Sequence, residues 1–233
     1  MSSDAENQLG LLLEAVYSFS TSHGAKVVAS VDEKSSLFLE WIPYLNSQKT
    51  GVADELLDGA VSSLREAAAC AGLGLVRPAL LALRTEIDLV LGWIYFKDHR
   101  VEWEYLNVSG DGFKLKKEIL DYLSKHVAGY GARNGILKEV KKRLEVDPYR
   151  LLSAHVHSQS LYTLPLVAEL KDVVGTSETL EELPMLAFEV DEYVSDILFS
   201  IYAPSWTQIA QTLRSKLDLR FKTPAQKNTF YSC

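Results

Sequence analysis

The sequence has no apolar run of the roughly 18 to 20 residues that a membrane-spanning helix needs. The longest candidate lies within residues 75–98, where Arg84, Glu86 and Asp88 interrupt it. The first residues, MSSDAENQ, also lack the basic region and the apolar stretch of a secretory signal. We therefore expect a cytoplasmic protein that does not have a membrane as its partner.

Cysteine and phosphate-binding glycine motifs are also scarce. The two cysteines, Cys70 in an apolar segment and Cys233, cannot build a disulfide framework or a cysteine-rich zinc site. The glycines of GYGARNG (129–135) resemble a nucleotide-binding loop, but Asn134 stands where a third glycine is required. We expect neither a metal nor a cofactor.

Patterns typical of β-strands are short and few, whereas apolar residues recur at helical spacing along nearly the whole chain. Leu9, Leu12, Leu13 and Val16 follow intervals of three and four, and residues 52–74 repeat this pattern. The sequence predicts a single all-α bundle of about seven to nine helices, with a central helix over 78–97. Other helices are expected over 114–127, 135–146, from Asp147 onward, and over 164–175, 176–203 and 205–217. We expect an N-terminal helical extension (1–50), the bundle itself (51–218) and a flexible tail (219–233).

The net charge of −7 is unevenly distributed. Residues 114–150 contain ten Lys or Arg against five Asp or Glu, and residues 160–200 contain one Lys against nine acids. Both regions have the composition of solvated helix faces, but the basic one also suits a polyanion. Its candidate RNA-binding residues are Lys138, Lys141, Lys142 and Arg143.

The segment YRLLSAHVHSQS (149–160) carries the candidate catalytic residues, just behind a helix start at Asp147-Pro148. On a regular helix, Arg150 and His157 lie within about 20° of each other, with Ser153 between them. His155 lies about 140° from Arg150, beside two leucines, and is the rival candidate. The pair His155 and His157 would point about 200° apart, which does not suit a shared metal ion.

A purely structural interpretation uses the same residues. Arg150 would pair with Glu145 or with an acid from 176–196, and His157 would be a partly buried histidine with its hydrogen bonds satisfied. In the apolar segment, Arg84 would form internal ion pairs with Glu86 or Asp88 that fix the register of the helices.

The motif Arg150-Leu-Leu-Ser-Ala-His155 resembles that of the HEPN superfamily of helical ribonucleases, in which four to six residues separate an arginine from a histidine. The spacing from Arg150 to His157 fits as well. An earlier apolar helix with Arg84 and Glu86 is similar to one in relatives of that family. The resemblance implies a compact helical bundle, usually a homodimer in which two motifs face one cleft.

The chemistry that the resemblance implies is metal-independent RNA cleavage. Arg150 would hold the phosphate through parallel hydrogen bonds, and His157 or His155 would transfer a proton near neutral pH. The first hypothesis is therefore an endoribonuclease in prokaryotic defence or a toxin–antitoxin system, with RNA and a cognate protein as partners. The alternatives are a catalytically silent helical module that binds a protein or nucleotide, favoured by Leu151 after the arginine, and an adaptor whose acidic helix 176–196 docks a basic partner.

Overall fold

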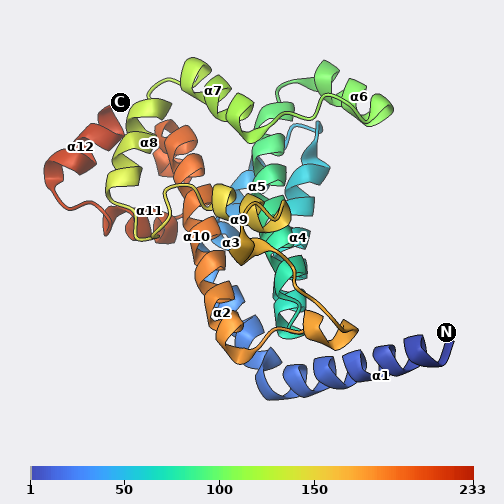
Figure 1. Ribbon diagram of the computed structural model, residues 1–233. Coiled ribbons are helices and arrows are strands. Elements are labelled where there is room, and N and C mark those ends of the chain that lie inside the picture. Colours follow the sequence, from blue (N-terminus) through green and yellow to red (C-terminus); the bar gives the residue numbers. More distant parts are fainter. Residues whose placement is uncertain (1) are drawn as a thin grey trace. The chain divides into compact units, whose positions relative to one another are not determined.

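The computed structural model describes the backbone of residues 2–233, and the side chains of residues 4–176 and 182–233. It confirms the all-α class, since residues 2–233 form helices and connecting turns without a β-strand (Figure 1). The α-helices run from α1 to α12, which is more than the seven to nine expected. In the described part of the chain, no helix is both long and apolar enough to cross a bilayer.

The helices are mostly short and follow one another closely. Those of the first half are α1 (Ser2–Phe19), α2 (Ala25–Lys34), α3 (Ser36–Ser47), α4 (Asp54–Gly72), α5 (Val76–Phe96) and α6 (Arg100–Ser109). Those of the second half are α7 (Lys116–His126), α8 (Tyr130–Glu139), α9 (Pro148–Val156), α10 (Ser177–Tyr202), α11 (Gln211–Asp218) and α12 (Pro224–Ser232). A π-helical turn, η1 (Ser20–Gly24), joins α1 to α2, and the 3-10 turns are η2 (Leu161–Thr163), η3 (Leu170–Val173) and η4 (Ala203–Gln208).

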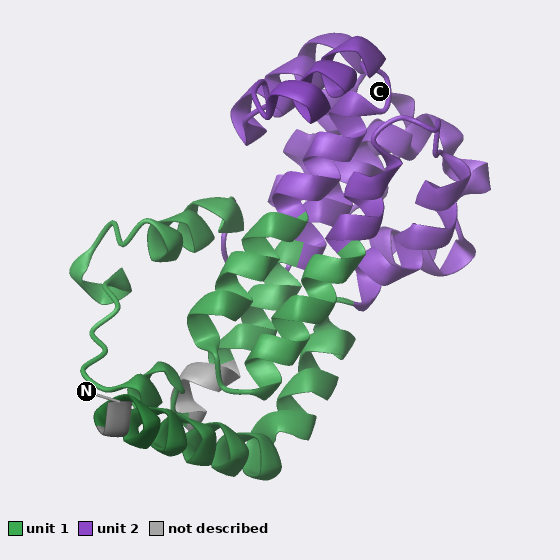
Figure 2. Cartoon of the chain, turned by 90° about the vertical axis from the view of Figure 1, so that its right-hand side faces the viewer, with its two compact units in different colours: residues 1–35, 61–86, 147–190 green, residues 36–60, 87–146, 191–233 purple. Residues whose placement is uncertain are grey.

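The chain forms two compact units, each assembled from three separate segments (Figure 2). Unit 1 contains residues 1–35, 61–86 and 147–190, and unit 2 contains residues 36–60, 87–146 and 191–233. The helices α4, α5 and α10 each contribute residues to both. Each unit is thus defined by contacts between segments that are distant in sequence, and domain boundaries at 51 and 219 remain predictions.

Unit 2 has an aromatic core. Its largest fully buried side chains are those of Phe38, Trp41, Trp93, Phe96, Phe199 and Phe230. The rings of Trp41 and Phe199 meet edge to face with centroids 4.8 Å apart, an arrangement that adds to the free energy gained from burying apolar area. The indole nitrogen of Trp93 donates to Asp54 at 3.2 Å, so this buried polar group is satisfied.

The last residues of the chain form a helix where the sequence suggests a flexible tail. Thr223 caps α12 by accepting from the backbone nitrogen of Gln226 at 3.2 Å, and Pro224 occupies the first turn. The side chain of Phe230 is fully buried. Arg133 donates to the carbonyl oxygens of Phe230 and Cys233, which attaches this segment to α8. The apolar Phe230 and the buried arginine explain why the segment packs.

Candidate functional site

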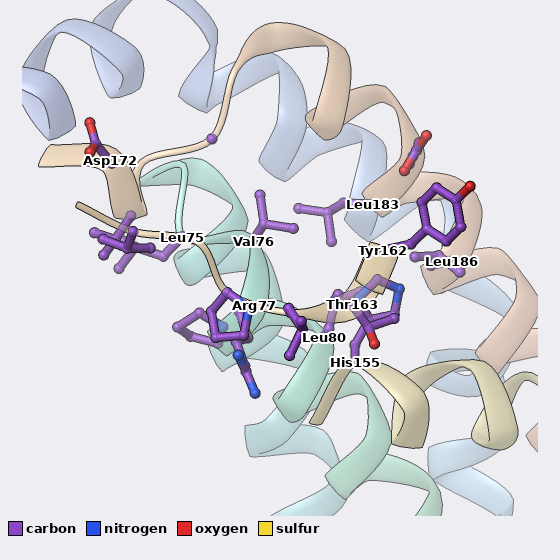
Figure 3. Close-up of a pocket in the computed structure, with 17 residues that line it drawn as sticks. Leu75, Val76, Arg77, Leu80, His155, Tyr162, Thr163, Asp172, Leu183 and Leu186 are labelled. Carbon is purple, nitrogen blue, oxygen red and sulfur yellow. The ribbon is translucent and has the colours of Figure 1, made fainter. Parts of the chain in front are cut away.

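Unit 1 contains a pocket of about 650 Å³ (Figure 3). Its walls are the start of α5, the end of α9, residues 182–186 of α10 and the irregular segment 157–176, which we call the strap. The strap contains only the short turns η2 and η3. A pocket of this volume is large enough for a small organic molecule.

The strap is attached at its C-terminal end to the turn that precedes α5. The backbone nitrogen of Gly175 donates to the carbonyl oxygen of Gly74 at 2.9 Å. Gly74 has a φ of +81°, and a Cβ there would lie 2.8 Å from Cγ1 of Val174. Only glycine gives this turn its conformation without strain and lets the strap approach so closely.

Other hydrogen bonds hold the strap at its N-terminal end and near η3. Nη2 of Arg77 donates to the carbonyl oxygen of Val156 at 3.0 Å and to Oγ of Ser158 at 3.1 Å. Near the other end, the backbone nitrogen of Leu170 donates to Oε1 of Gln8 in α1 at 3.1 Å. Polar contacts therefore fix both ends of the strap, while its middle section carries apolar side chains.

The wall of the pocket is mostly apolar. Figure 3 shows Val76, Leu80 and Leu183 in the middle of the view, with Leu186 near Tyr162 at one side. Leu80 and Leu183 are buried in the packing between helices, and Val76 is half-buried. Helical spacing brings Val76 and Leu80 to the same face of α5.

The polar side chains of the pocket include His155, Arg77 and Glu182. Burial lowers the pKa of His155, and Arg77 lowers it further, while Glu182 opposes the shift. Because the pKa lies below its usual value, the imidazole is neutral at neutral pH. In Figure 3, Asp172 lies on the opposite side of the view from His155. The structure thus places one candidate histidine in the pocket.

The other members of the arginine–histidine motif lie outside the pocket lining. Helix α9 starts at Pro148, as the sequence predicts, although the side chain of Asp147 does not cap it. The helix ends at Val156, so His157 is already its C-terminal cap residue. The backbone nitrogen of His157 still donates to the carbonyl oxygen of Ser153 at 2.9 Å, as in a regular helix, and the side chains of Arg150 and His157 are both exposed.

Ser153 does not complete a catalytic group with either histidine. Its side chain is half-buried, and its hydroxyl has no hydrogen-bond partner among the described residues. The pairing of Arg150 with Glu145 or with an acid from 176–196 remains a prediction. Within residues 4–176 and 182–233, no three His, Cys, Asp or Glu side chains gather as a metal site requires.

The predicted basic strip is only partly exposed, and the helix expected over 135–146 ends at Glu139. Lys138 and Lys142 are exposed, whereas Nζ of Lys141 donates to the carbonyl oxygens of Arg143 and Leu144. The guanidinium of Arg143 is buried. Arg143 therefore cannot contribute to an exposed RNA track, because its charge is used inside unit 2.

The partners of Arg143 come from the acidic run. Glu192 accepts from Nη1 of Arg143 at 3.3 Å, and Asp196 accepts from the same nitrogen. Nη1 of Arg220 donates to Asp196 at 2.6 Å. All four side chains are buried. Glu192 and Asp196 are therefore not available to dock a basic partner, as the adaptor hypothesis for 176–196 requires, since internal arginines neutralise them. The side chains of residues 177–181 lie outside the described part of the chain.

The structure also places the three residues of α5 for which internal ion pairs are expected, Arg84, Glu86 and Asp88. Glu86 is buried, and Arg84 and Asp88 are half-buried. Nη2 of Arg84 donates to the hydroxyl of Tyr149 at 2.8 Å, and its guanidinium lies 4.9 Å from the centre of that ring. This contact ties α5 to α9 within unit 1, whereas the expected ion pairs among the three remain a prediction.

Arg77 and Glu182 are the pocket residues that sequence reasoning missed. The signal for Arg77 was its place beside Pro78, in the first turn of an apolar helix where a cation has no obvious role. The sequence pattern over 164–175 predicts a helix and so does not indicate the irregular strap. In the structure, only Leu170–Val173 form a short 3-10 turn there. Comparison with protein-family models, with curated proteins and with solved structures finds no match for this chain.

Proposed function

We propose that this protein is a helical binding module and that the pocket of unit 1 holds a small, mostly apolar ligand. The observation that carries this proposal is the pocket itself, which has an apolar wall and lies beneath a strap whose ends are both fixed. Ligand sites are usually concave and largely apolar, with a few polar groups that orient the ligand.

The strap supplies the apolar area that a ligand would cover. Leu164, Val167 and Val173 line the pocket and are 41%, 46% and 39% exposed. Each 100 Å² of apolar surface removed from water contributes about 2.5 kcal/mol, before the cost of ordering the ligand. Burying parts of these three side chains together with Val76 is therefore sufficient for measurable affinity.

Titration with a neutral dye that fluoresces in apolar surroundings, N-phenyl-1-naphthylamine, tests this proposal. The wild type should bind the dye, and Val76→Phe should weaken binding about tenfold or more, because the larger ring occupies the pocket. The matched control is Val108→Phe in α6, at a residue that is 90% exposed and far from the lining residues in sequence. No dye binding by the wild type, or equal binding by Val76→Phe, would reject the proposal.

A second candidate function is the metal-independent endoribonuclease of a HEPN-like homodimer. Its support is the exposure of Arg150 and His157 on and just after α9, where both side chains can reach an RNA phosphate. Incubation of the protein with total RNA in a chelator, beside Arg150→Ala and His157→Ala, tests it. Cleavage that disappears in both variants supports the ribonuclease, and cleavage that persists in both, or is absent from the wild type, removes it.

A further inference from the structure

Arg77 is a half-buried cation at the edge of an apolar pocket. Its two hydrogen bonds go to neutral oxygens, the carbonyl of Val156 and the hydroxyl of Ser158, and both come from Nη2. Among the described residues, no carboxylate forms an ion pair with Arg77, and Nε and Nη1 make no hydrogen bond. A guanidinium carries five donors and binds a carboxylate through two parallel bonds, so most of this capacity remains available.

His155 lines the same pocket from α9. Besides burial, Glu182 raises the pKa of His155 and Arg77 lowers it, so charges of both signs act on this imidazole. The strap adds Thr163, whose hydroxyl already donates to the carbonyl oxygen of Ser160 at 3.0 Å. Arg77 from α5 and His155 from α9 are thus two side chains of the pocket that can donate hydrogen bonds to a ligand.

The two acidic side chains of the lining, Asp172 and Glu182, do not form ion pairs with Arg77. The carboxylate of Asp172 accepts from the backbone nitrogen of Glu169 at 2.9 Å and lies across the pocket from His155. Glu182 acts on His155, but its own side chain is exposed, so water screens its charge. The guanidinium of Arg77 is half-buried and is screened less by water, although Glu182 has the larger of the two effects on the pKa of His155.

We propose that the natural ligand is an aliphatic carboxylate, with its carboxylate held by Arg77 and His155 and its chain lying over Val76, Leu80 and Leu183. This inference rests on the proposed function and specifies the class of ligand. A neutral apolar ligand would leave the charge of Arg77 without a counter-ion among the residues whose side chains are described. A nucleotide would place a polar sugar and several phosphates against the leucines and valines of the wall.

Two ligands with the same chain and different heads test the inference: decanoate and decanol, each used to displace the neutral dye at pH 7.5. The wild type should bind decanoate about tenfold or more tightly than decanol, since a charge-assisted pair in a half-buried site contributes about 1.4 kcal/mol or more. Arg77→Gln should bind the two ligands equally, and Arg77→Lys should keep part of the preference because the charge remains.

The control variant is Ser158→Ala, which removes one bond of the strap and leaves the guanidinium in place. It should retain the preference for decanoate. If it loses the preference as fully as Arg77→Gln does, the strap rather than the charge causes the selectivity and the inference is overturned.

The outcomes separate the two proposals. Equal binding of both ligands by the wild type, or tighter binding of decanol, overturns the carboxylate and leaves the binding pocket standing. If neither the dye nor either ligand binds, the proposed function itself fails. Should Arg77→Gln not fold, which circular dichroism would show, the comparison of decanoate with decanol in the wild type still decides.

Discussion

The carboxylate of Asp191, on α10, accepts a hydrogen bond from the backbone nitrogen of Phe38 at 2.6 Å, and a second from that of Leu37 at 3.3 Å. These donors belong to the first turn of α3, whose N–H groups have no partner within the helix. A residue more than 150 positions away in sequence therefore caps α3 inside unit 2.

Burial makes the ionised form of Asp191 costly. Burial raises its pKa to about 8, although the two backbone nitrogens and Lys216 act in the opposite direction and Glu192 adds to the increase. A carboxyl whose pKa is higher in the folded state binds a proton more tightly there than in the unfolded chain. Its contribution to stability is complete below pH 4 and is lost as the pH rises toward 8.

The variant Asp191→Asn keeps an oxygen that can accept from Phe38 but cannot ionise. We therefore predict that it lacks the fall in stability with rising pH that Asp191 causes. The wild type should lose a few kcal/mol of this contribution between about pH 4 and pH 8, and the variant should not. Urea unfolding at several pH values measures both, with Asp4→Asn at an exposed position of α1 as the control. A variant whose stability follows the same pH slope as the wild type would contradict the raised pKa.

The second prediction concerns the buried cluster of Arg143, Glu192, Asp196 and Arg220. Arg143→Met should destabilise the fold by roughly 3 to 5 kcal/mol, because it leaves buried carboxylates with less compensating charge. Lys138→Met, in the exposed part of the same basic region, should change the free energy of unfolding by less than about 0.5 kcal/mol. Chemical denaturation checks both. A small effect of Arg143→Met would contradict the role of Arg143 in compensating the buried carboxylates.

Helix positions that depend on local spacing could be predicted from the sequence, and those that depend on distant partners could not. The expected central helix over 78–97 corresponds to α5, Val76–Phe96, because its apolar residues recur at helical intervals. The helix expected over 135–146 ends early instead. Glu192 accepts from the backbone nitrogens of Lys142 and Arg143 at 3.0 and 2.7 Å, so a residue about fifty positions away satisfies donors that a helix would use.

The candidate site shows the same limit. The start of α9 could be predicted from Asp147-Pro148, whereas its end at Val156 could not. The sequence of the strap predicts an amphipathic helix because its leucines and valines have helical spacing. Its bonds to Gly74, Arg77 and Gln8 stabilise another conformation, and none of these residues is near it in sequence.

The third prediction is that Gly74→Ala loosens the strap. The positive φ of Gly74 and the close approach of Val174 should together cost about 1 to 3 kcal/mol. Trypsin should then cut more rapidly after Lys171, the only Lys or Arg between residues 158 and 176. Gly10→Ala is the matched control, since nothing lies within 4 Å of the added Cβ and helix α1 should gain about 0.5 to 1 kcal/mol. Unchanged cleavage in Gly74→Ala would show that this turn does not hold the strap.

The fourth prediction is a pH dependence of carboxylate binding through His155. The groups that act on this imidazole are Arg77 from α5 and Glu182 from α10, and burial keeps it neutral at neutral pH. A bound carboxylate favours the protonated imidazole, so by linkage protonation must favour the carboxylate. The affinity for decanoate should therefore rise about three- to tenfold as the pH falls from 8 to 6, with no change for decanol. His155→Gln should remove the rise and keep the preference for decanoate that Arg77 provides. A rise that persists in His155→Gln would assign the titration to another group and exclude His155 from the head-group site.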